Sequence, residues 1–408
     1  MRDSVLKSIF TVLMVLLALA GTVLWMASYF WGLFFLLGAA GVYILNLLIV
    51  ENKEKVRERI SSLGGNLLIP LVGIVSAIII GAVIMIATGY NPIEAYGALF
   101  YGGFVRNWHV SILNATPLIF TGLSVAFAFK AGLFNIGAEG QYYVGAMAAT
   151  FLGIYLKLPG ILALPLIFLV SGAVAGMYNY VPAVLKVKTG AHEVITTMML
   201  AHVARYMSSV FIKGFGGDPQ TSRHPYVSWE ILENNFLPRF KEFLPQANYR
   251  VHVGILIGIV MALFVYYILF YTKFGFEIRA VGENPLAAKT QGISTSTNIY
   301  RALLFAGFLS GLAGVSQVTG LDHKLFENLS AGYGWNGISV ALLASNHPIG
   351  VIFTSILWGA LDAGGQYMAR TVQTPNSIVE IIKGIILFLV VARYIYTSLG
   401  NRLRRKKI

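Results

Sequence analysis

The residues with the clearest chemical potential lie in the segment Lys130–Gln141, which reads KAGLFNIGAEGQ. Asn135 and Gln141 supply amide donors and acceptors, and Glu139 supplies a carboxylate, within a Gly-rich stretch. Apolar residues run almost continuously from Ile112 to Tyr155 around it, so we expect the segment at or inside a bilayer. Irregular polar backbone is tolerated there only against protein or a water-filled cavity. The pattern is typical of a transport pathway.

Glu139 is the costly member of this segment, because a carboxylate at membrane depth needs a cation, several donors or water. Two interpretations are open. The carboxylate either pins a broken helix through backbone amides, an arrangement that the helix dipole favours, or contacts the transported molecule directly.

The second half of the chain contains a weaker echo of this break. Phe134-Asn135-Ile136-Gly137 and Trp335-Asn336-Gly337 each place an aromatic residue and an Asn next to glycine. Paired interruptions in corresponding positions predict repeats that meet at a substrate site. The predicted pathway residues are Phe134, Asn135, Glu139, Gln141, Trp335 and Asn336.

Other residue combinations argue against catalysis by this chain. His192 and Glu193 have no second His one helical turn away, so a zinc site is improbable. The chain has no cysteine, and it contains no G-x-x-x-x-G-K-[ST] phosphate loop, so it is not a nucleotide hydrolase of that kind. Glu380 and Lys383 are spaced for a helical ion pair, whereas Asp362 has no obvious local partner.

The composition predicts the elements that position these residues. Of 408 residues, 57% are hydrophobic and 12% are charged, and the mean hydropathy is +0.72, whereas soluble domains carry about a quarter charged residues. Apolar runs of roughly 20 residues match a hydrocarbon core crossed by a helix. We therefore predict spans near 9–27, 30–50, 67–89, 112–129, 141–156, 159–178, 192–212, 251–272, 296–319, 335–346, 348–367 and 375–394.

The net charge of +13 comes from short basic tracts between apolar runs. Such tracts indicate cytoplasmic loops rather than a nucleic-acid surface, so we expect no nucleic-acid partner. The assignment places both termini in the cytoplasm, with a basic tail at 401–408. An N-terminal two-span hairpin with a charged linker (1–60) precedes a main domain (61–400), which includes an external cap (213–250) and a cytoplasmic loop (273–295).

Within that loop, Asn284 followed by Pro285 predicts the start of a short helix, with Asn as the cap and Pro at the first position. A short alanine-rich helix between two spans buries little of its own surface. It suits a groove on a partner protein, although a simple loop is an equally good interpretation of the residues alone.

Three segments together resemble the permease subunits of bacterial ABC importers for nucleosides and simple sugars: Ala115–Gln141, Thr189–Leu200 (TGAHEVITTMML) and Arg279–Ile293 (RAVGENPLAAKTQGI). The resemblance covers roughly residues 65–395 and is nearest to the nucleoside branch. It implies a multi-pass protein of the bacterial cytoplasmic membrane that works with a second related permease, two ATPase subunits and an extracytoplasmic substrate-binding protein or lipoprotein. No cofactor is implied in this chain, because ATP and Mg would bind the ATPase subunits.

By the same resemblance, the cytoplasmic loop is similar to the coupling helix that docks into the ATPase. Its expected coupling residues are Gly282, Glu283, Asn284, Pro285, Ala287, Ala288 and Gly292. The chain departs from the family pattern at His192, which replaces an Asn, at Ala201-His202, which replaces an Asn-Tyr pair, and at Asn336, where an acidic residue is usual. These departures bear on the substrate rather than on the architecture.

The sequence thus predicts an all-α polytopic membrane protein with about 10–12 transmembrane segments, broken helices and a pseudo-repeat, of the ABC importer permease type. We predict that this chain moves nucleosides across the membrane without catalysing a reaction, and that membrane lipids surround it. Two alternatives remain: a simple-sugar importer permease, and a self-sufficient transporter in which Glu139, Glu380 or Asp362 carries a proton.

Overall fold

The computed structural model describes residues 73–215, 227–243 and 249–391. The predicted hairpin at 1–60 and the basic tail at 401–408 lie outside the described residues, as do parts of the predicted cap. Apart from residues 73–76, the described residues belong to one compact unit, Ala77–Phe243 and Tyr249–Ile408.

The described chain is helical and contains no strand, only two isolated bridges, Val227–Phe326 and Arg239–His252. A first helix covers Gly73–Ala87. The later elements are α4 (Pro92–Phe100), the π-helical η1 (Tyr101–Arg106), α5 (Trp108–Lys130), α6 (Ala138–Tyr155), α7 (Gly160–Tyr178), α8 (Tyr180–Thr189), α9 (Glu193–Phe215), η3 (Glu233–Asn235), α10 (Phe240–Phe243), α11 (Gly254–Tyr271), α12 (Lys273–Glu283), α13 (Pro285–Thr290), α14 (Thr295–Gln317), the π-helical η4 (Val318–Asp322), α15 (Tyr333–Leu343), α16 (Pro348–Thr371) and α17 (Ser377–Val391).

Length and composition make this a multi-pass membrane protein. Five of the described segments are long and apolar enough to cross a bilayer: Trp108–Lys130, Gly160–Thr189, Gly254–Tyr271, Thr295–Asp322 and Pro348–Thr371. Each agrees with a predicted span to within a few residues, except that α7 continues almost directly into α8. The basic residues Lys186 and Lys188 lie in the last turn of α8.

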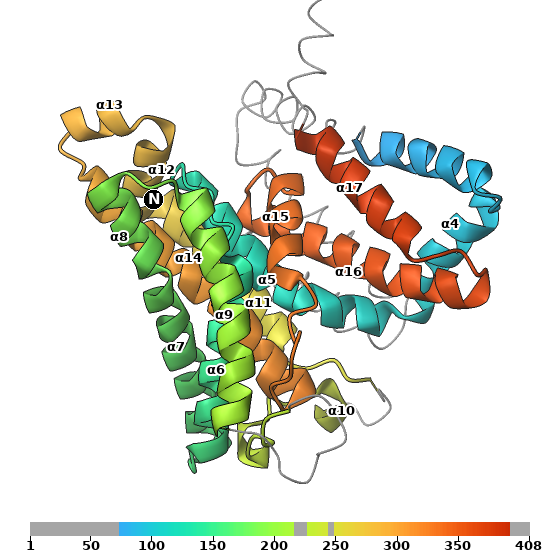
Figure 1. Ribbon diagram of the computed structural model, residues 1–408, viewed down its shortest axis with the longest axis horizontal. Coiled ribbons are helices and arrows are strands. Elements are labelled where there is room, and N and C mark those ends of the chain that lie inside the picture. Colours follow the sequence, from blue (N-terminus) through green and yellow to red (C-terminus); the bar gives the residue numbers. More distant parts are fainter. Residues whose placement is uncertain (1–72, 216–226, 244–248, 392–408) are drawn as a thin grey trace, which may run out of the picture. The chain divides into compact units, whose positions relative to one another are not determined.

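Two of these spans, α5 and α14, form the centre of the helical packing. Helix α5 contacts α11, α14, α15 and α16, and α14 also contacts α6 and α7 (Figure 1). Both segments are buried along most of their length: in each, 83% of the 18-residue apolar stretch is buried inside the protein. Small residues allow the close approach: a Cβ on Gly314 would lie 2.1 Å from the Tyr142 carbonyl oxygen of α6. Membrane helices commonly pack through such small residues.

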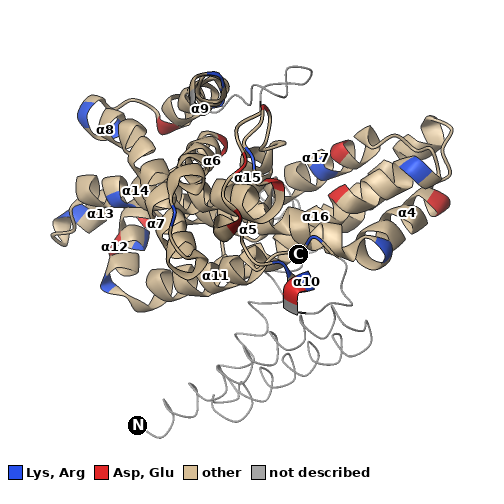
Figure 2. Ribbon diagram, turned by 90° about the horizontal axis from the view of Figure 1, so that it is seen from below, with Lys and Arg blue, Asp and Glu red and all other residues tan. Residues whose placement is uncertain are grey.

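Basic residues are frequent along α8, α12 and α13 (Figure 2), and they include Lys188, Lys273 and Lys289. An excess of Lys and Arg marks the cytoplasmic side of a membrane protein. This end of the helices, which includes the predicted coupling segment, therefore has the charge pattern typical of a cytoplasmic side.

Candidate functional site

The first break in the membrane helices lies between α5 and α6, at the segment that the sequence singled out. The chain leaves α5 at Lys130 and turns through Gly132, whose φ of +71° favours glycine. The side chains of Asn135 and Gln141 then form a reciprocal amide pair, with both N···O distances at 2.9 Å. Asn135 also donates to the Ser124 hydroxyl and accepts from the Gly137 N–H, each at 3.2 Å.

This pairing determines what the two amides are able to do. Asn135 is 0% exposed and Gln141 is 1% exposed. Because a buried amide is costly unless it is hydrogen-bonded, the pair holds the break in one conformation. Neither amide is placed at an open surface, although both were predicted as pathway residues.

Glu139 lies in the first turn of α6, and its side chain caps a different helix. Its Oε2 accepts the Gly334 N–H at 2.8 Å, and the Trp335 N–H and the Ser330 hydroxyl also donate to the carboxylate. Gly334 is necessary for this approach, since a Cβ there would lie 2.2 Å from the Glu139 nitrogen. The carboxylate therefore sits at the positive end of α15 and ties the first break to the second.

The second break precedes α15 and is more irregular than the first. Its backbone enters the left-handed region at His323, Asn328, Ala331 and Gly332, and three of these residues have side chains that resist this conformation. The Thr121 hydroxyl of α5 donates to the Tyr333 carbonyl at 3.1 Å. The start of α15 is therefore held between α5 and α6.

The predicted pathway residues of α15 are more accessible than those of the first break. Trp335 and Asn336 are both half-buried. The Trp335 ring lies 6.2 Å from the exposed His202 ring of α9, and Asn336 Oδ1 accepts from Trp358 Nε1 at 3.3 Å. Phe134 is also half-buried but packs edge-on against Phe129, with ring centroids 4.7 Å apart. The structure thus brings Glu139 and Trp335 together, whereas the Phe134 ring packs against Phe129.

The predicted short helix in the cytoplasmic loop is confirmed as α13. The Asn284 side chain caps it by accepting from the Leu286 and Ala287 N–H groups at 3.1 and 3.0 Å, and Pro285 occupies its first turn. Ala288 is 5% exposed, whereas the neighbouring Leu286 is 78% exposed. Of the other predicted coupling residues, Glu283, Asn284, Pro285, Ala287 and Gly292 are exposed.

Gly282 joins this segment to the first break. A Cβ at Gly282 would lie 2.2 Å from the Lys130 carbonyl oxygen and 2.8 Å from the Gly132 nitrogen. The end of α12 and the turn after α5 are thus in backbone contact. The two backbones meet there with no side chain in between.

An ion cluster that the sequence only partly predicted links α16 to α17. Lys383 is 4% exposed and donates to Glu380 at 3.0 Å, as the helical spacing predicted, and it also pairs with Asp362 of α16. Its ammonium lies 5.7 Å from the Trp358 ring centroid. The missing partner of Asp362 is distant in sequence, so no local pattern indicated it.

The loops that the sequence predicted to be external are joined to one another by backbone hydrogen bonds. The Ser228 N–H donates to the Leu325 carbonyl at 2.8 Å, and the Leu237 N–H donates to the Thr319 carbonyl at 2.8 Å. His252, 2% exposed, accepts the Gly254 N–H at 3.2 Å. Burial, with the neighbouring Arg239 and His323, lowers the pKa of His252 to about 3.

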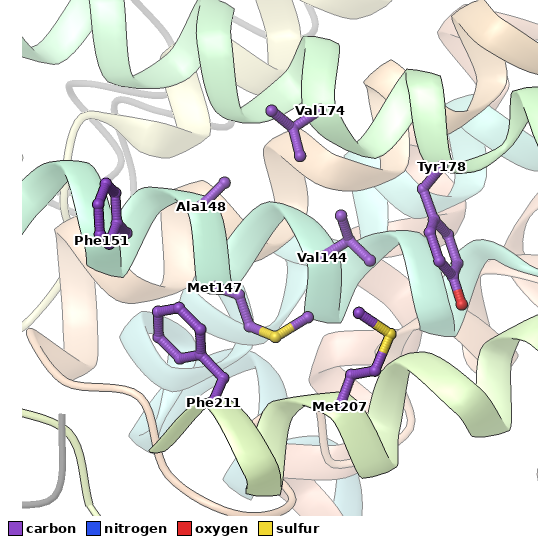
Figure 3. A pocket seen from close by; sticks show the side chains of 8 residues that line it. All are labelled: Val144, Met147, Ala148, Phe151, Val174, Tyr178, Met207 and Phe211. Carbon is purple, nitrogen blue, oxygen red and sulfur yellow. The ribbon is translucent and has the colours of Figure 1, made fainter. Parts of the chain in front are cut away.

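Two hollows in the described part of the chain are lined by apolar side chains. One, of about 390 Å³, is lined by side chains of α6, α7 and α9 that include Val144, Met147, Val174 and Met207 (Figure 3). The Tyr178 hydroxyl at its rim donates to the Leu200 carbonyl. The described residues contain no group of three or more His, Cys, Asp or Glu side chains placed to hold a metal ion.

Comparisons with known proteins give a consistent result. Residues 110–391 match the family described as the permease component of branched-chain amino acid transport systems. The chain is 34% identical to the guanosine ABC transporter permease protein NupP of Bacillus subtilis, over 84% of this chain and 97% of the relative. It is 32% identical to the nucleoside ABC transporter permease protein NupB of Lactococcus lactis, over 80% and 91%.

A relative with a different cargo is nearly as similar. The glucose ABC transporter permease protein TsgB13 of Haloferax volcanii is 30% identical, over 80% of this chain and 87% of the relative. No solved structure matches this chain.

Proposed function

Because this chain belongs to the family of ABC transporter permeases of the branched-chain amino acid type, we propose that it is the membrane subunit of an ATP-driven importer of nucleosides. The cargo class is supported by the two relatives that carry guanosine and nucleosides. The glucose permease is slightly less similar, so a sugar is the rival cargo.

The observation that carries the mechanism is the contact between Gly282 and the turn at Gly132. The exposed α13 would dock on an ATPase subunit, where ATP and Mg²⁺ bind and hydrolysis supplies the free energy. Motion of α13 would pass through α12 into the turn after α5, and from there to Asn135, Gln141 and Glu139. Because Glu139 caps α15, both breaks would move together, and the passage would alternate between outward and inward openings.

The remaining partners follow from the family. A second permease subunit would complete the passage, two ATPase subunits would bind on the cytoplasmic side, and a substrate-binding protein or lipoprotein would deliver the nucleoside to the external loops. Both termini would lie in the cytoplasm. This chain itself would translocate without catalysing a reaction, and its affinity for cargo would be low because the passage must release it.

The coupling role is tested by replacing the exposed apolar residue of α13. Leu286→Asp combined with Pro285→Gly should leave membrane insertion and permease pairing intact but abolish ATP-dependent uptake. Leu286→Met is the matched control, because it retains an apolar side chain of similar size, and uptake should persist. Normal uptake by the double variant would refute the docking role of α13.

A further inference from the structure

Helix α9 has two exposed flanks of different chemistry, and neither is among the residues predicted for the pathway. At 100° per residue, positions four and seven apart lie on one face of a helix. One stripe, here called the polar flank, contains the exposed His202 and Arg205, together with the exposed Met198 and the half-buried Ser209. The other, called the apolar flank, comprises the exposed Met199, Val203, Met207 and Val210. A third stripe through Thr197, Ala201 and Ala204 is buried, and α9 packs against α6.

The depth of the polar flank makes it difficult to place against lipid. Helix α9 has 23 residues, or roughly 34 Å at 1.5 Å per residue, enough to cross a hydrocarbon core. His202 lies nine residues after its first residue, and Arg205 twelve, so both are near its middle. A charged side chain at this depth costs about 2.5 kcal/mol or more. Consistent with these polar residues, α9 is not among the five segments that are apolar enough to be candidate spans.

The apolar flank is the side of α9 whose exposed side chains are compatible with lipid. Met207 and Phe211 line the apolar hollow between α6, α7 and α9 (Figure 3). Val203 is 46% exposed and Val210 is 70% exposed. The two flanks thus differ in chemistry although they are at the same depth.

The polar flank faces the second break of the membrane helices. Arg205 donates to the Asn328 side chain at 2.5 Å, within the loop that precedes α15. The His202 ring lies 6.2 Å from the Trp335 ring at an interplanar angle of 40°. Both rings are accessible, since His202 is exposed and Trp335 is half-buried. Two accessible rings set at an angle form a corner that suits the flat, apolar face and polar edge of a nucleobase.

We propose that the polar flank of α9 and the N-terminal turn of α15 together form the wall of the passage, and that His202 and Trp335 contact the nucleobase of the cargo. Arg205, held by Asn328, keeps the loop before α15 against this wall. The nucleobase assignment rests on the proposed function, whereas the assignment of the wall to α9 does not.

The natural absence of cysteine allows a direct test in the complete transporter complex. His202→Cys and Val203→Cys place single thiols one residue apart, at nearly one depth but about 100° apart around the helix, one on each flank. A charged, water-soluble methanethiosulfonate should modify position 202 at least about tenfold faster than position 203, because thiolates form and react in water and not in lipid. Saturating guanosine together with its binding protein should slow the reaction at position 202.

Each result of this test has a definite meaning. Equal rates at the two positions, or no reaction at position 202, would overturn the wall assignment. If guanosine does not slow the modification of the thiol at position 202, the proposed contact with the nucleobase is overturned. If the unmodified complex does not transport guanosine, the proposed function fails, yet the ratio of rates at 202 and 203 still decides the wall assignment.

A second pair of variants measures the contribution to transport. His202→Leu should lower kcat/KM for guanosine uptake by about tenfold. Val203→Leu should leave it unchanged. An unaltered kcat/KM in the His202 variant would contradict the proposed contact.

Discussion

The Glu139 carboxylate accepts the backbone N–H of Gly334, which joins the first turn of α6 to the first turn of α15 across 195 positions of sequence. The arrangement places negative charge where the unpaired N–H groups of α15 converge. Two irregular segments, each unfavourable in a membrane by itself, thereby satisfy one another. The two breaks form one structural unit, and changes at either break are expected to affect both.

Removing the carboxylate should weaken this unit. Glu139→Ala leaves the Gly334 and Trp335 N–H groups without their acceptor, at about 1–3 kcal/mol for each buried donor. Glu139→Gln keeps one acceptor oxygen and should retain most of the stability. Thermal unfolding of the purified protein in detergent, followed by tryptophan fluorescence, measures the difference. If the Gln variant is as stable as wild type but transports nothing, the carboxylate has a direct role in moving cargo instead.

The amide pair of the first break can be measured by a double-mutant cycle. Asn135→Ala and Gln141→Ala should each destabilise the protein by about 1–3 kcal/mol, because each leaves a buried amide partly unpaired. The double variant should cost less than the sum of the two. Strict additivity in thermal unfolding would show that the two side chains do not depend on one another.

The backbone contact at Gly282 should be intolerant of a single added methyl group. Gly282→Ala places a Cβ 2.2 Å from the Lys130 carbonyl oxygen, which forces α12 away from the turn. Uptake should fall by about tenfold or more while the complex continues to hydrolyse ATP. Gly97→Ala is the matched control, because no atom lies within 4 Å of a Cβ built there. Wild-type uptake by the Gly282 variant would exclude this contact as the route of coupling.

The protein should lose more stability when the ion cluster loses Lys383 alone than when it loses both Lys383 and Asp362. Lys383→Met leaves the Asp362 carboxylate without its cation and should cost roughly 3 kcal/mol. Adding Asp362→Leu removes the uncompensated charge, so much of the stability should return. Thermal unfolding of the single and double variants provides the comparison. A double variant less stable than the single one would show that the pair contributes net stability.

The loop structure around His252 should lose stability in acid. The pKa of His252 in the folded protein, about 3, lies below the ordinary value of 6.5, so the unfolded loop takes up a proton that the folded loop excludes. The stability that the neutral ring contributes is complete above pH 6.5 and falls as the pH decreases toward 3. At pH 5 the loss should be about 2 kcal/mol.

Hydrogen exchange measures this loss locally. The protection of the Phe240 N–H, which donates to the Val251 carbonyl at 3.0 Å, should decrease between pH 8 and pH 5 once intrinsic rates are corrected. His252→Gln keeps an acceptor for Gly254 but does not titrate, so its protection should not depend on pH. The same decrease in the Gln variant would assign the effect to another group.

Features with a local cause could be predicted from the sequence. The Asn284-Pro285 start of α13 follows from capping chemistry within three residues. The first break is predicted because glycine, Asn and Glu interrupt an apolar run. The Glu380–Lys383 pair follows from helical spacing.

Features that depend on residues distant in sequence could not be predicted. Asn135 and Gln141 were interpreted as free hydrogen-bonding groups because no pattern showed that they face each other. The capping of α15 by Glu139, the partnership of Lys383 with Asp362 and the contact of Gly282 with Gly132 all depend on helices that meet only in the folded protein. The polar flank of α9 had a signal in the spacing of His202 and Arg205, but it became evident only once α15 was placed beside it.

The proposed function is tested most directly by uptake of radiolabelled guanosine into proteoliposomes that contain the complete complex, with the binding protein outside and ATP inside. We predict accumulation that requires ATP, persists when a protonophore abolishes the proton gradient, and disappears in the Leu286→Asp, Pro285→Gly variant. Guanosine accumulation by the purified chain alone, driven by a proton gradient and independent of ATP, would contradict the account.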